Sequence, residues 1–261
     1  MIDTLKTIDY IVTWLKKYCD SAGMDGFVVG ISGGIDSALT STLCARTGLP
    51  LIVLNLPINQ KKVHSDRSAR HIAWLESNFD NVSGMTIALT PTFQTLKNTF
   101  PEDIQDNLTM ANTQSRLRMV ALYAVANHYR RLVTGTGNKV EDFGVGFFTK
   151  YGDGGVDLSP IADLMKSEVY ALAKAVGIAE EILQAPPTDG LWDDNRTDET
   201  QIGASYAELE WAMGMDESAT DEESLSPRQK KVLAIYRRMH RANRHKMVPV
   251  PVCTIPEDFR K

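Results

Sequence analysis

The stretch Gly26-Phe-Val-Val-Gly-Ile-Ser-Gly-Gly-Ile-Asp-Ser37 carries the strongest local structural signals in the chain. Its first half, Gly26–Ile31, is a short apolar run bounded by glycines, which is typical of a buried strand. A helix is predicted over about Ile35–Arg46, so the glycine-rich segment is a strand-to-helix turn. Adjacent glycines expose N–H groups that no Cβ shields, and a helix N-terminus favours anions. The turn therefore predicts a site for a phosphate chain.

Asp36 lies inside this turn, where a carboxylate would repel a phosphate unless it held a divalent cation. The other nucleotide-binding motifs fit poorly. No lysine follows Gly34, as a Walker loop requires, and the residues after Gly30 do not have the spacing of the dinucleotide fingerprint. The simpler alternative is a turn with a serine cap and an exposed aspartate. Ser-Gly-Gly-x-Asp-Ser directly after an apolar strand disfavours that alternative.

Strand-like and helix-like segments alternate on either side of this turn. Apolar runs predict further strands at Leu51–Leu56, Met85–Leu89 and Arg131–Thr134. Helical spacing predicts helices over Ile2–Cys19, Ser65–Ser77 and about Asp106–Arg130. In the last helix the residues expected to face inward are Leu117, Val120, Ala121, Ala124 and Val125. The alternation predicts an α/β fold: a doubly wound, mainly parallel, Rossmann-like sheet with helices on both faces.

The pattern changes after Thr136. Gly137–Gly155 is rich in glycine and aromatic residues and is too long for an ordinary connection, so we expect it to be functional. Helices are predicted over Asp163–Val176, Tyr206–Met213 and Pro227–Asn243, and the acidic stretch Asp189–Thr200 is predicted to be a mobile loop. We expect one domain over residues 1–261, with an α/β core over about 1–177 and a helical portion over about 178–261.

Composition excludes several classes of protein. The chain has 261 residues, 43% hydrophobic and 23% charged, with a net charge of −5 that disfavours non-specific binding to nucleic acid. Cys19, Cys44 and Cys253 lie far apart, which suits a reducing compartment and forms no zinc cluster. The longest apolar stretch, around Leu49–Ile58, is shorter than the roughly 20 residues of a membrane span, and no signal peptide is recognisable. We expect a cytoplasmic protein with no membrane and no nucleic-acid partner.

A second motif, Thr134-Gly-Thr-Gly-Asn-Lys-Val-Glu141, follows the fourth predicted strand, at the edge where α/β sheets place their ligands. Thr136 can reach a nucleotide there, and Glu141 is a second carboxylate for a hard cation. Phe147-Phe-Thr-Lys-Tyr-Gly-Asp-Gly-Gly-Val-Asp-Leu-Ser-Pro160 comes next. Read alone, that run is equally well an ordinary turn flanked by solvated charged residues.

Taken together, these segments resemble a known family. The loop Ser32–Ser37 resembles the pyrophosphate loop of the ATP pyrophosphatases, which adenylate a substrate oxygen and have the adenine nucleotide α-hydrolase-like fold. With Gly-Thr-Gly-Asn-Lys-x-Glu from Gly135 and Phe-Phe-Thr-Lys-Tyr-Gly-Asp-Gly-Gly from Phe147, the chain is similar to the ammonia-dependent NAD synthetases of that superfamily. The similarity extends over nearly the whole chain, as far as Arg244-His-Lys246.

The resemblance implies a role for each matching residue. Those implied to bind ATP are Gly30, Ile31, Ser32, Gly33, Gly34, Ile35, Asp36, Ser37, Thr136, Lys166 and Thr188. Those implied to bind deamido-NAD (nicotinic acid adenine dinucleotide) are Arg116, Lys150, Asp157, His245 and Lys246, with Arg118 as the alternative to Arg116. Asp36 and Glu141 are implied to bind Mg²⁺, and together with Lys166 they form the implied catalytic set.

The implied reaction is the ATP- and Mg²⁺-dependent amidation of deamido-NAD to NAD, the final step of NAD biosynthesis. The substrate carboxylate attacks the α-phosphorus of ATP and expels pyrophosphate; ammonia then attacks the acyl-adenylate and releases AMP, while Mg²⁺ and Lys166 offset the developing charge. The short segment before Gly30 leaves no room for a glutaminase domain, so free ammonia is the expected donor. The resemblance also implies a homodimer, with the helix around Met119–Tyr129 as the candidate contact. Asn55 stands where many relatives have arginine, which puts the adenine-side contacts in question.

Two other functions compete with this interpretation. A basic helix and tail could follow a tRNA backbone, as in tRNA-modifying members of the superfamily; it comprises Arg228, Lys230, Lys231, Arg237, Arg238, Arg241, Arg244 and Lys246. The acidic stretch Asp216–Glu223 favours a solvated charged face instead, and the cysteine pair of the thiolating enzymes is missing. A non-catalytic nucleotide-binding protein is the second alternative. It would not require both metal carboxylates, which argues against it.

Overall fold

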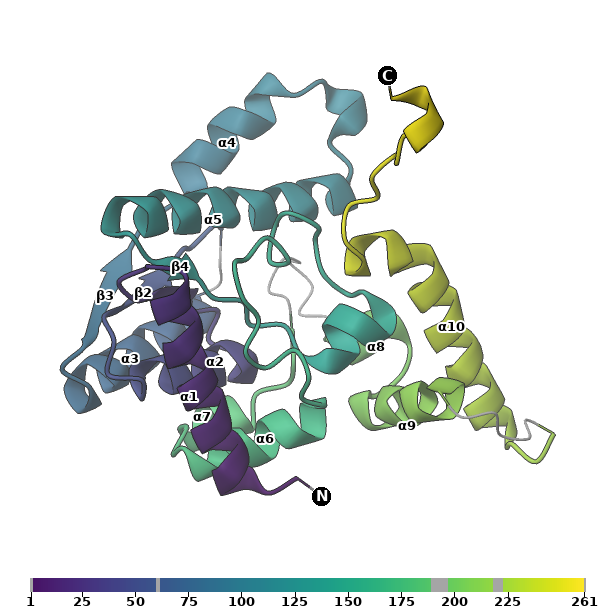
Figure 1. The fold of residues 1–261 in the computed structure, drawn as a ribbon, viewed down its shortest axis with the longest axis horizontal. Helices are drawn as coiled ribbons and strands as arrows, with labels where there is room; N and C mark the ends of the chain where they lie inside the picture. The colour runs from purple at the N-terminus through teal and green to yellow at the C-terminus, as the bar shows by residue number, and fades with distance from the viewer. Residues whose placement is uncertain (1, 60–61, 189–196, 218–222, 261) are drawn as a thin grey trace.

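The computed structural model describes residues 2–59, 62–188, 197–217 and 223–260. Its sheet consists of β1 (Phe27–Gly30), β2 (Leu51–Asn55), β3 (Val82–Thr86) and β4 (Leu132–Val133), in the order β3-β2-β1-β4. The sheet lies on the left in Figure 1, away from α9 and α10. Each strand runs parallel to its neighbours in this sheet. The predicted parallel α/β sheet is confirmed.

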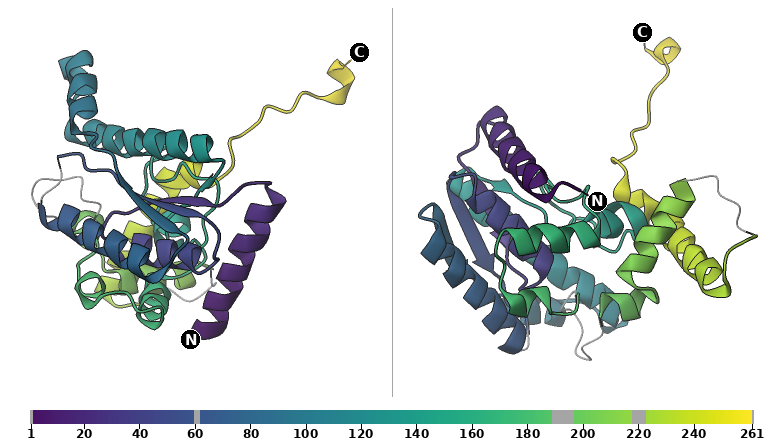
Figure 2. Two further views of the ribbon diagram at one scale, coloured as in Figure 1. Left: turned by 90° about the vertical axis from the view of Figure 1, so that its left-hand side faces the viewer. Right: turned by 90° about the horizontal axis from the view of Figure 1, so that it is seen from below.

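Helices cover both faces of the sheet, because alternate residues of a strand point to opposite sides. The face that carries Phe27 and Leu51 is buried under α1 (Thr4–Ser21), α2 (Ile35–Ala45), α3 (Lys62–Asn78), α6 (Lys166–Ala175) and α7 (Glu180–Leu183). The face that carries Val28 and Ile52 is buried under α4 (Thr90–Thr99) and α5 (Asn107–Tyr129). Figure 2 shows the strands between these two helical layers. The sheet is doubly wound, as predicted.

The C-terminal helices build a third apolar cluster beside the sheet. The π-helix η2 (Val140–Val145) packs there with α8 (Asp198–Ile202), α9 (Tyr206–Glu217) and α10 (Pro227–Met247). Beyond α10 the chain runs away from the body of the molecule to the short turn η3 (Glu257–Phe259), as Figures 1 and 2 show. Neither these helices nor any other in the described part of the chain is long and apolar enough to span a membrane.

The third strand begins earlier than the predicted Met85–Leu89, because β3 pairs with β2 from Val82 onward. β3 forms the edge of the sheet and exposes Ser83 and Gly84, so its first half lacks the apolar pattern that indicates a strand. The apolar residues that follow lead into α4, and the N–H groups of Ile87 and Leu89 still bond to carbonyl groups of the β2 segment. Helix α4, with Pro91 in its first turn, is not predicted by the sequence pattern.

Helix α5 begins and ends within a residue of its predicted bounds, but its inward face differs. Ala121 and Val125 are buried and Leu117 is half-buried, as predicted. Val120 is 57% exposed and Ala124 is exposed, so the prediction is wrong for both. Successive residues of an α-helix are about 100° apart around its axis. Val120 and Ala124, each one position before a buried residue, therefore lie outside the narrow buried stripe.

Three other segments differ from the expectation. Gly137–Gly155 contains the π-helix η2 rather than only irregular chain. The helix predicted from Asp163 begins at Lys166, because the Met165 N–H donates to the Glu168 carboxylate (2.9 Å) and closes a cap there. In the predicted mobile loop Asp189–Thr200, residues 189–196 lie outside the described residues, and Asp198 begins α8. The α1, α2, α3, α9 and α10 helices overlap their predicted ranges.

A buried histidine connects α3 to α2. His71 is 3% exposed, its Nε2 lies 3.0 Å from the Ser41 Oγ, and its ring stacks on Trp74. Burial lowers the pKa of His71 from 6.5 to about 4. Between those pH values the unfolded chain binds a proton at this residue and the folded chain does not, so stability falls as the pH falls.

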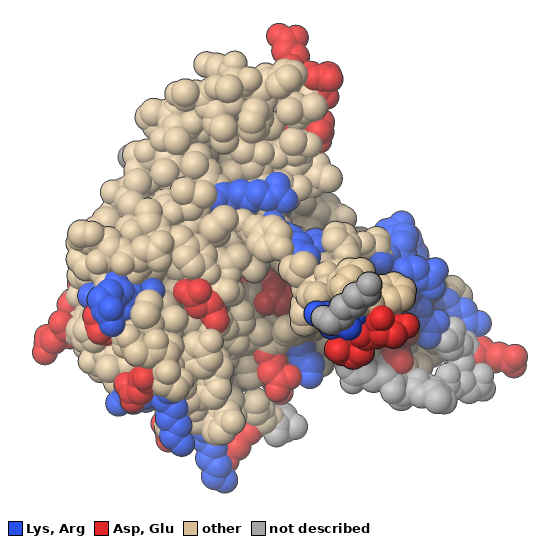
Figure 3. All heavy atoms as spheres, turned by 45° about the horizontal axis from the view of Figure 1, so that its top comes forward, with Lys and Arg blue, Asp and Glu red and all other residues tan. Residues whose placement is uncertain are grey.

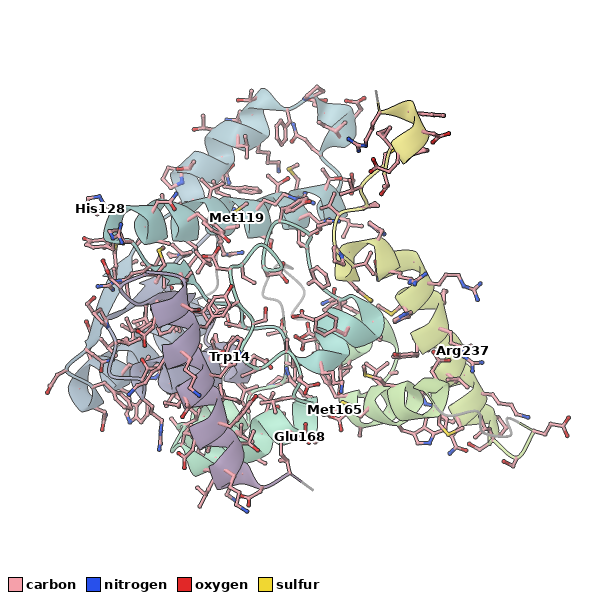
Figure 4. The ribbon with its side chains drawn as sticks, viewed as in Figure 1. Trp14, Met119, His128, Met165, Glu168 and Arg237 are labelled. Atoms are coloured by element: carbon pink, nitrogen blue, oxygen red, sulfur yellow. The ribbon has the colours of Figure 1, made fainter. Side chains whose placement is uncertain are left out.

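We predict that His71 removes about 3 kcal/mol from the free energy of unfolding as the pH drops from neutral to its folded-state pKa. Urea unfolding across this range should therefore give a flatter pH dependence for His71→Gln than for the wild type. His128→Gln is the matched control, because His128 is exposed at the end of α5 (Figure 4) and should leave the wild-type dependence unchanged. Equal pH dependence in the wild type and His71→Gln contradicts the prediction.

Candidate active site

The glycine-rich turn forms a compact loop between β1 and α2. Gly33 has φ +82°, a left-handed conformation that favours glycine, and Gly34 is the N-cap of α2. The buried Ser37 hydroxyl accepts from the Ser32 N–H (3.2 Å) and donates to the Gly34 carbonyl (3.0 Å). The Ser32 and Ser37 hydroxyls lie 3.0 Å apart. These bonds fix the loop at the start of a helix, where N–H groups can bind an anion.

A buried ion cluster lies beside this loop. The Lys166 Nζ is 2.6 Å from the Asp36 Oδ2 and 3.1 Å from the Glu141 Oε1. Asp36 lies in the first turn of α2, Glu141 in η2, and Lys166 at the first position of α6, next to the labelled Met165 in Figure 4. The Lys166 side chain is 3% exposed. The structure thus brings together the three residues that the sequence analysis implies to be catalytic.

The charges in this cluster depend on one another. Burial alone would lower the pKa of Lys166, but the two carboxylates outweigh it and hold that pKa far above its usual range. Burial raises the pKa of Glu141, and the Lys166 ammonium opposes that effect. Burial also raises the pKa of the neighbouring Asp142 to about 8, with the Glu141 charge adding to the rise. Lys166 therefore stays positive and stabilises an arrangement of acids that would otherwise repel one another.

Two contacting residues are absent from the sequence-based assignment. Asn138 is fully buried; its Nδ2 donates to the Asp36 Oδ1 (3.0 Å), and its Oδ1 accepts from the Glu141 N–H (3.2 Å). Its position inside Gly-Thr-Gly-Asn-Lys-x-Glu is the signal that could have found it. The Tyr206 hydroxyl donates to the Glu141 Oε1 (2.5 Å). Nothing local indicates Tyr206, because it reaches the cluster from a distant helix.

The donor set suits a hard cation that shares its ligands with phosphates. Within the described ranges, no three His, Cys, Asp or Glu side chains are grouped as a metal site. Asp36 and Glu141 nevertheless offer carboxylate oxygens next to the phosphate loop. Mg²⁺ typically takes one or two carboxylates and completes its shell with substrate phosphates and water. The two residues therefore fit a Mg²⁺ ion bound together with a nucleotide.

The other residues implied to bind ATP are Thr136, which follows β4, and Thr188, which follows α7. Thr136 is half-buried in the loop from β4 to Asn138, and Thr188 is the last residue described before position 189. Asn55 ends β2 and is buried, and within the described part of the chain its Oδ1 has no hydrogen-bond partner. Asn55 therefore offers an unpaired acceptor next to the strand that carries the phosphate loop.

A second, basic cluster joins α5, the segment after η2 and the end of α10. The Arg116 Nε donates to the Lys150 carbonyl (3.3 Å), and the Lys150 Nζ donates to the His245 carbonyl (2.9 Å). The Lys246 Nζ donates to the carbonyls of Gly146 (2.5 Å) and Phe148 (2.6 Å). Four of the five residues implied to bind deamido-NAD thus lie in one connected group.

Asp157 and Arg118 lie elsewhere. The Asp157 carboxylate accepts from the Tyr123 hydroxyl (3.0 Å) and the Val133 N–H (2.7 Å), which ties it to α5 and β4. The Arg118 Nε donates to the Leu56 carbonyl (3.1 Å), beyond β2. Arg116 therefore contacts the basic cluster, whereas the Arg118 Nε contacts the chain just after β2.

The basic face of α10 is partly used by the fold. Figure 3 shows Lys and Arg side chains gathered over this helix. Arg228 pairs with Glu208 (2.6 Å) and Arg237 with Asp216 (2.6 Å), and both acids lie on α9. These pairs close the contact between α9 and α10, which favours a structural role for part of the face over binding to a nucleic-acid backbone.

Comparison with known proteins gives consistent results. Residues 7–249 match the family model described as NAD synthase. A curated relative from Methanosarcina acetivorans, named NH(3)-dependent NAD(+) synthetase, is 37% identical and aligns over 86% of this chain and 87% of its own. The solved NMN synthetase from Francisella tularensis superposes with a TM-score of 0.85 at 32% identity, covering 98% of this chain and 100% of that one. The NH3-dependent NAD synthetase from Campylobacter jejuni gives 0.79 at 25% identity, covering 97% and 100%.

We predict that Lys166→Met lowers the free energy of unfolding by about 3–5 kcal/mol at neutral pH, because it leaves two buried carboxylates without their counter-charge. The loss should shrink in mild acid, where Glu141 takes up a proton. Adding Glu141→Gln should recover part of the loss. All three effects are measured by denaturant unfolding at the two pH values.

Lys139→Met is the control for this measurement. Lys139 pairs with Asp163 (3.1 Å), whose side chain is 97% exposed, so its loss should cost less than about 1 kcal/mol. If Lys166→Met is no more destabilising than this surface variant, the buried pairing does not stabilise the fold as argued.

Proposed function

The chain belongs to the NAD synthase family, and from that premise we propose that it amidates deamido-NAD to NAD, using ATP and free ammonia. The observation that carries the proposal is the buried contact of Lys166 with Asp36 and Glu141 beside an anion-binding loop. That arrangement suits phosphoryl chemistry, where negative charge develops on the oxygens around the α-phosphorus and on the departing pyrophosphate.

The reaction proceeds in two steps. A carboxylate oxygen of the substrate forms a bond to the α-phosphorus of ATP, and the bond from that phosphorus to pyrophosphate breaks. Ammonia then attacks the carbonyl carbon of the acyl-adenylate, AMP leaves with the bonding electrons, and a proton is released. The proposed ATP site comprises the loop from Gly30 to Ser37 with Thr136, Lys166 and Thr188. In it the loop N–H groups hold the phosphates while Lys166 offsets the charge of the leaving group.

Asp36 and Glu141 would hold a Mg²⁺ ion, which neutralises phosphate charge when bound. Asn138 donates to the Asp36 carboxylate and orients it, and it accepts from the backbone N–H of Glu141, which fixes the start of η2 beside Asp36. Lys166 is itself shielded from water between these acids, which strengthens its attraction for the negative charge that develops on the phosphate oxygens.

The basic cluster is the proposed site for the dinucleotide substrate. Arg116, Lys150, His245 and Lys246 come from three separate segments. The positive charges of Arg116, Lys150 and Lys246 complement the phosphates and the carboxylate of deamido-NAD. Asp157 completes the proposed set from the edge of β4, where Tyr123 and the Val133 N–H orient its carboxylate. We place the enzyme in the cytoplasm, a reducing compartment in which free cysteines persist.

A second candidate function is the amidation of the smaller nicotinic acid mononucleotide to NMN. The observation in its favour is the likeness to the Francisella NMN synthetase at a TM-score of 0.85. The chemistry at the carboxylate is the same in both cases. The two functions differ only in whether the acceptor carries an adenylyl group.

We predict that ATP, Mg²⁺, deamido-NAD and ammonium yield NAD, AMP and pyrophosphate in equal amounts, measured by chromatography of the nucleotides. Replacing deamido-NAD by nicotinic acid mononucleotide should lower kcat/KM, and replacing ammonium by glutamine should abolish the reaction. Asp36→Asn should reduce kcat about a hundredfold or more. Formation of ADP and phosphate would exclude adenylation, and preference for the mononucleotide would establish the second candidate.

We further propose that two copies of the chain associate through α5 between Met119 and Tyr129. The support is an apolar surface on this helix: Val120 is exposed, as are Ala124 and Tyr129.

In sedimentation velocity at micromolar concentration, we expect the wild type to sediment as a dimer. Val120→Glu should shift it toward the monomer, because it places a charge in the contact. Leu5→Glu, at an exposed apolar position on α1, should not. A wild-type monomer at this concentration contradicts the proposal.

A further inference from the structure

Tyr206 contacts two members of the ion cluster with one side chain. It is buried, and it opens helix α9 far from the phosphate loop in sequence. Its hydroxyl donates to the Glu141 Oε1 at 2.5 Å. The Lys166 Nζ lies 4.6 Å from the centroid of its ring, within the range of a cation–π contact.

These contacts converge on one oxygen atom. The Glu141 Oε1 accepts both from the Tyr206 hydroxyl and from the Lys166 ammonium, 3.1 Å away. A glutamate side chain rotates easily about its last bond, so a single contact would leave its two oxygens interchangeable. Two donors on the same oxygen define the plane of the carboxylate. The second oxygen is thereby held in a set direction.

Tyr206 is itself held against α6 by polar contacts near Lys166. The Glu210 carboxylate, one turn further along α9, accepts from both the N–H and the hydroxyl of Ser167 (2.8 Å each). The Tyr206 N–H donates to the Glu199 carboxylate (2.9 Å). The start of α9 is therefore fixed directly beside the start of α6, where Lys166 lies.

We propose that Tyr206 is a positioning residue that holds the Glu141 carboxylate in the orientation needed to bind a divalent cation together with ATP. The inference rests on the proposed function, because the cation and the nucleotide come from it. Tyr206 acts through Glu141 and does not touch the reacting atoms. Removing a residue that forms a hydrogen bond to a metal ligand typically weakens metal binding by 10- to 100-fold.

The alternative is that Tyr206 only fills space in the apolar cluster of the C-terminal helices. Tyr206→Phe separates the two, because phenylalanine keeps the ring, its packing and its contact with Lys166 but loses the hydroxyl. Tyr170→Phe is the matched control. Tyr170 lies one turn beyond Lys166 on α6, and within the described residues its hydroxyl makes no hydrogen bond to Glu141.

The experiment measures Mn²⁺ binding by electron paramagnetic resonance in the presence of a non-hydrolysable ATP analogue, alongside steady-state kinetics and thermal unfolding. For Tyr206→Phe we expect Mn²⁺ to bind about tenfold more weakly and kcat to fall about tenfold. The KM for deamido-NAD should stay within about twofold of the wild type, because the basic cluster is untouched. Tyr170→Phe should match the wild type in all these measurements.

A double-mutant cycle shows whether Tyr206 acts through Glu141. In a Glu141→Gln background, Tyr206→Phe should change Mn²⁺ affinity no further. Unchanged Mn²⁺ binding in Tyr206→Phe, or an equal loss in Tyr170→Phe, overturns the inference. A wild type that binds Mn²⁺ but makes no amide product contradicts the proposed function instead. The binding comparison then still tests Tyr206 on its own.

Discussion

Lys166 carries its ammonium group into the interior of the protein, where it contacts the carboxylates of Asp36 and Glu141. A buried charge costs several kcal/mol unless a well-placed partner compensates for it. The compensation here requires the start of α2, the π-helix η2 and the start of α6 to meet within hydrogen-bond distance. Each of these segments is placed by the apolar packing of its own element, so the ion cluster forms only when the sheet and both groups of helices are assembled.

The π-helix η2 is the segment that connects the two parts of the site. Glu141 near its start belongs to the ion cluster, and the carbonyl of Gly146, just past its end, accepts from Lys246 of the basic cluster. Single turns of π-helix are rare and occur mostly at functional sites, because the wider turn changes the direction of side chains. Here the wider turn lies between β4 and the C-terminal helices. Val140 and Val145 of η2 belong to the same apolar cluster as Leu209 of α9 and Val232 of α10.

Short sequence patterns predict the elements whose apolar residues, glycines and helix starts lie close together in the chain. Strand β1, the glycine-rich turn and helix α2 agree with prediction, because the apolar run, the glycines and the helix start all lie within a dozen residues of one another. The sequence pattern misplaces edge strand β3, because exposed Ser83 and Gly84 give no apolar signal. It also places Val120 on the wrong face of α5, because the exposure of that residue depends on what packs against the helix. In the site, Asp36, Glu141 and Lys166 belong to recognisable motifs, whereas Tyr206 has no motif around it.

The glycine-rich turn between β1 and α2, the α/β alternation and the family could be read from the sequence alone, because backbone preferences and short motifs are properties of neighbouring residues. Contacts between side chains that are distant in sequence follow from the tertiary structure. In the folded chain the Arg116 side chain contacts the Lys150 carbonyl, and the Asp157 carboxylate contacts the N–H of Val133 in β4. The Tyr206 hydroxyl contacts the Glu141 carboxylate. Those contacts depend on distances between segments far apart in the chain, and packing of the apolar clusters sets those distances.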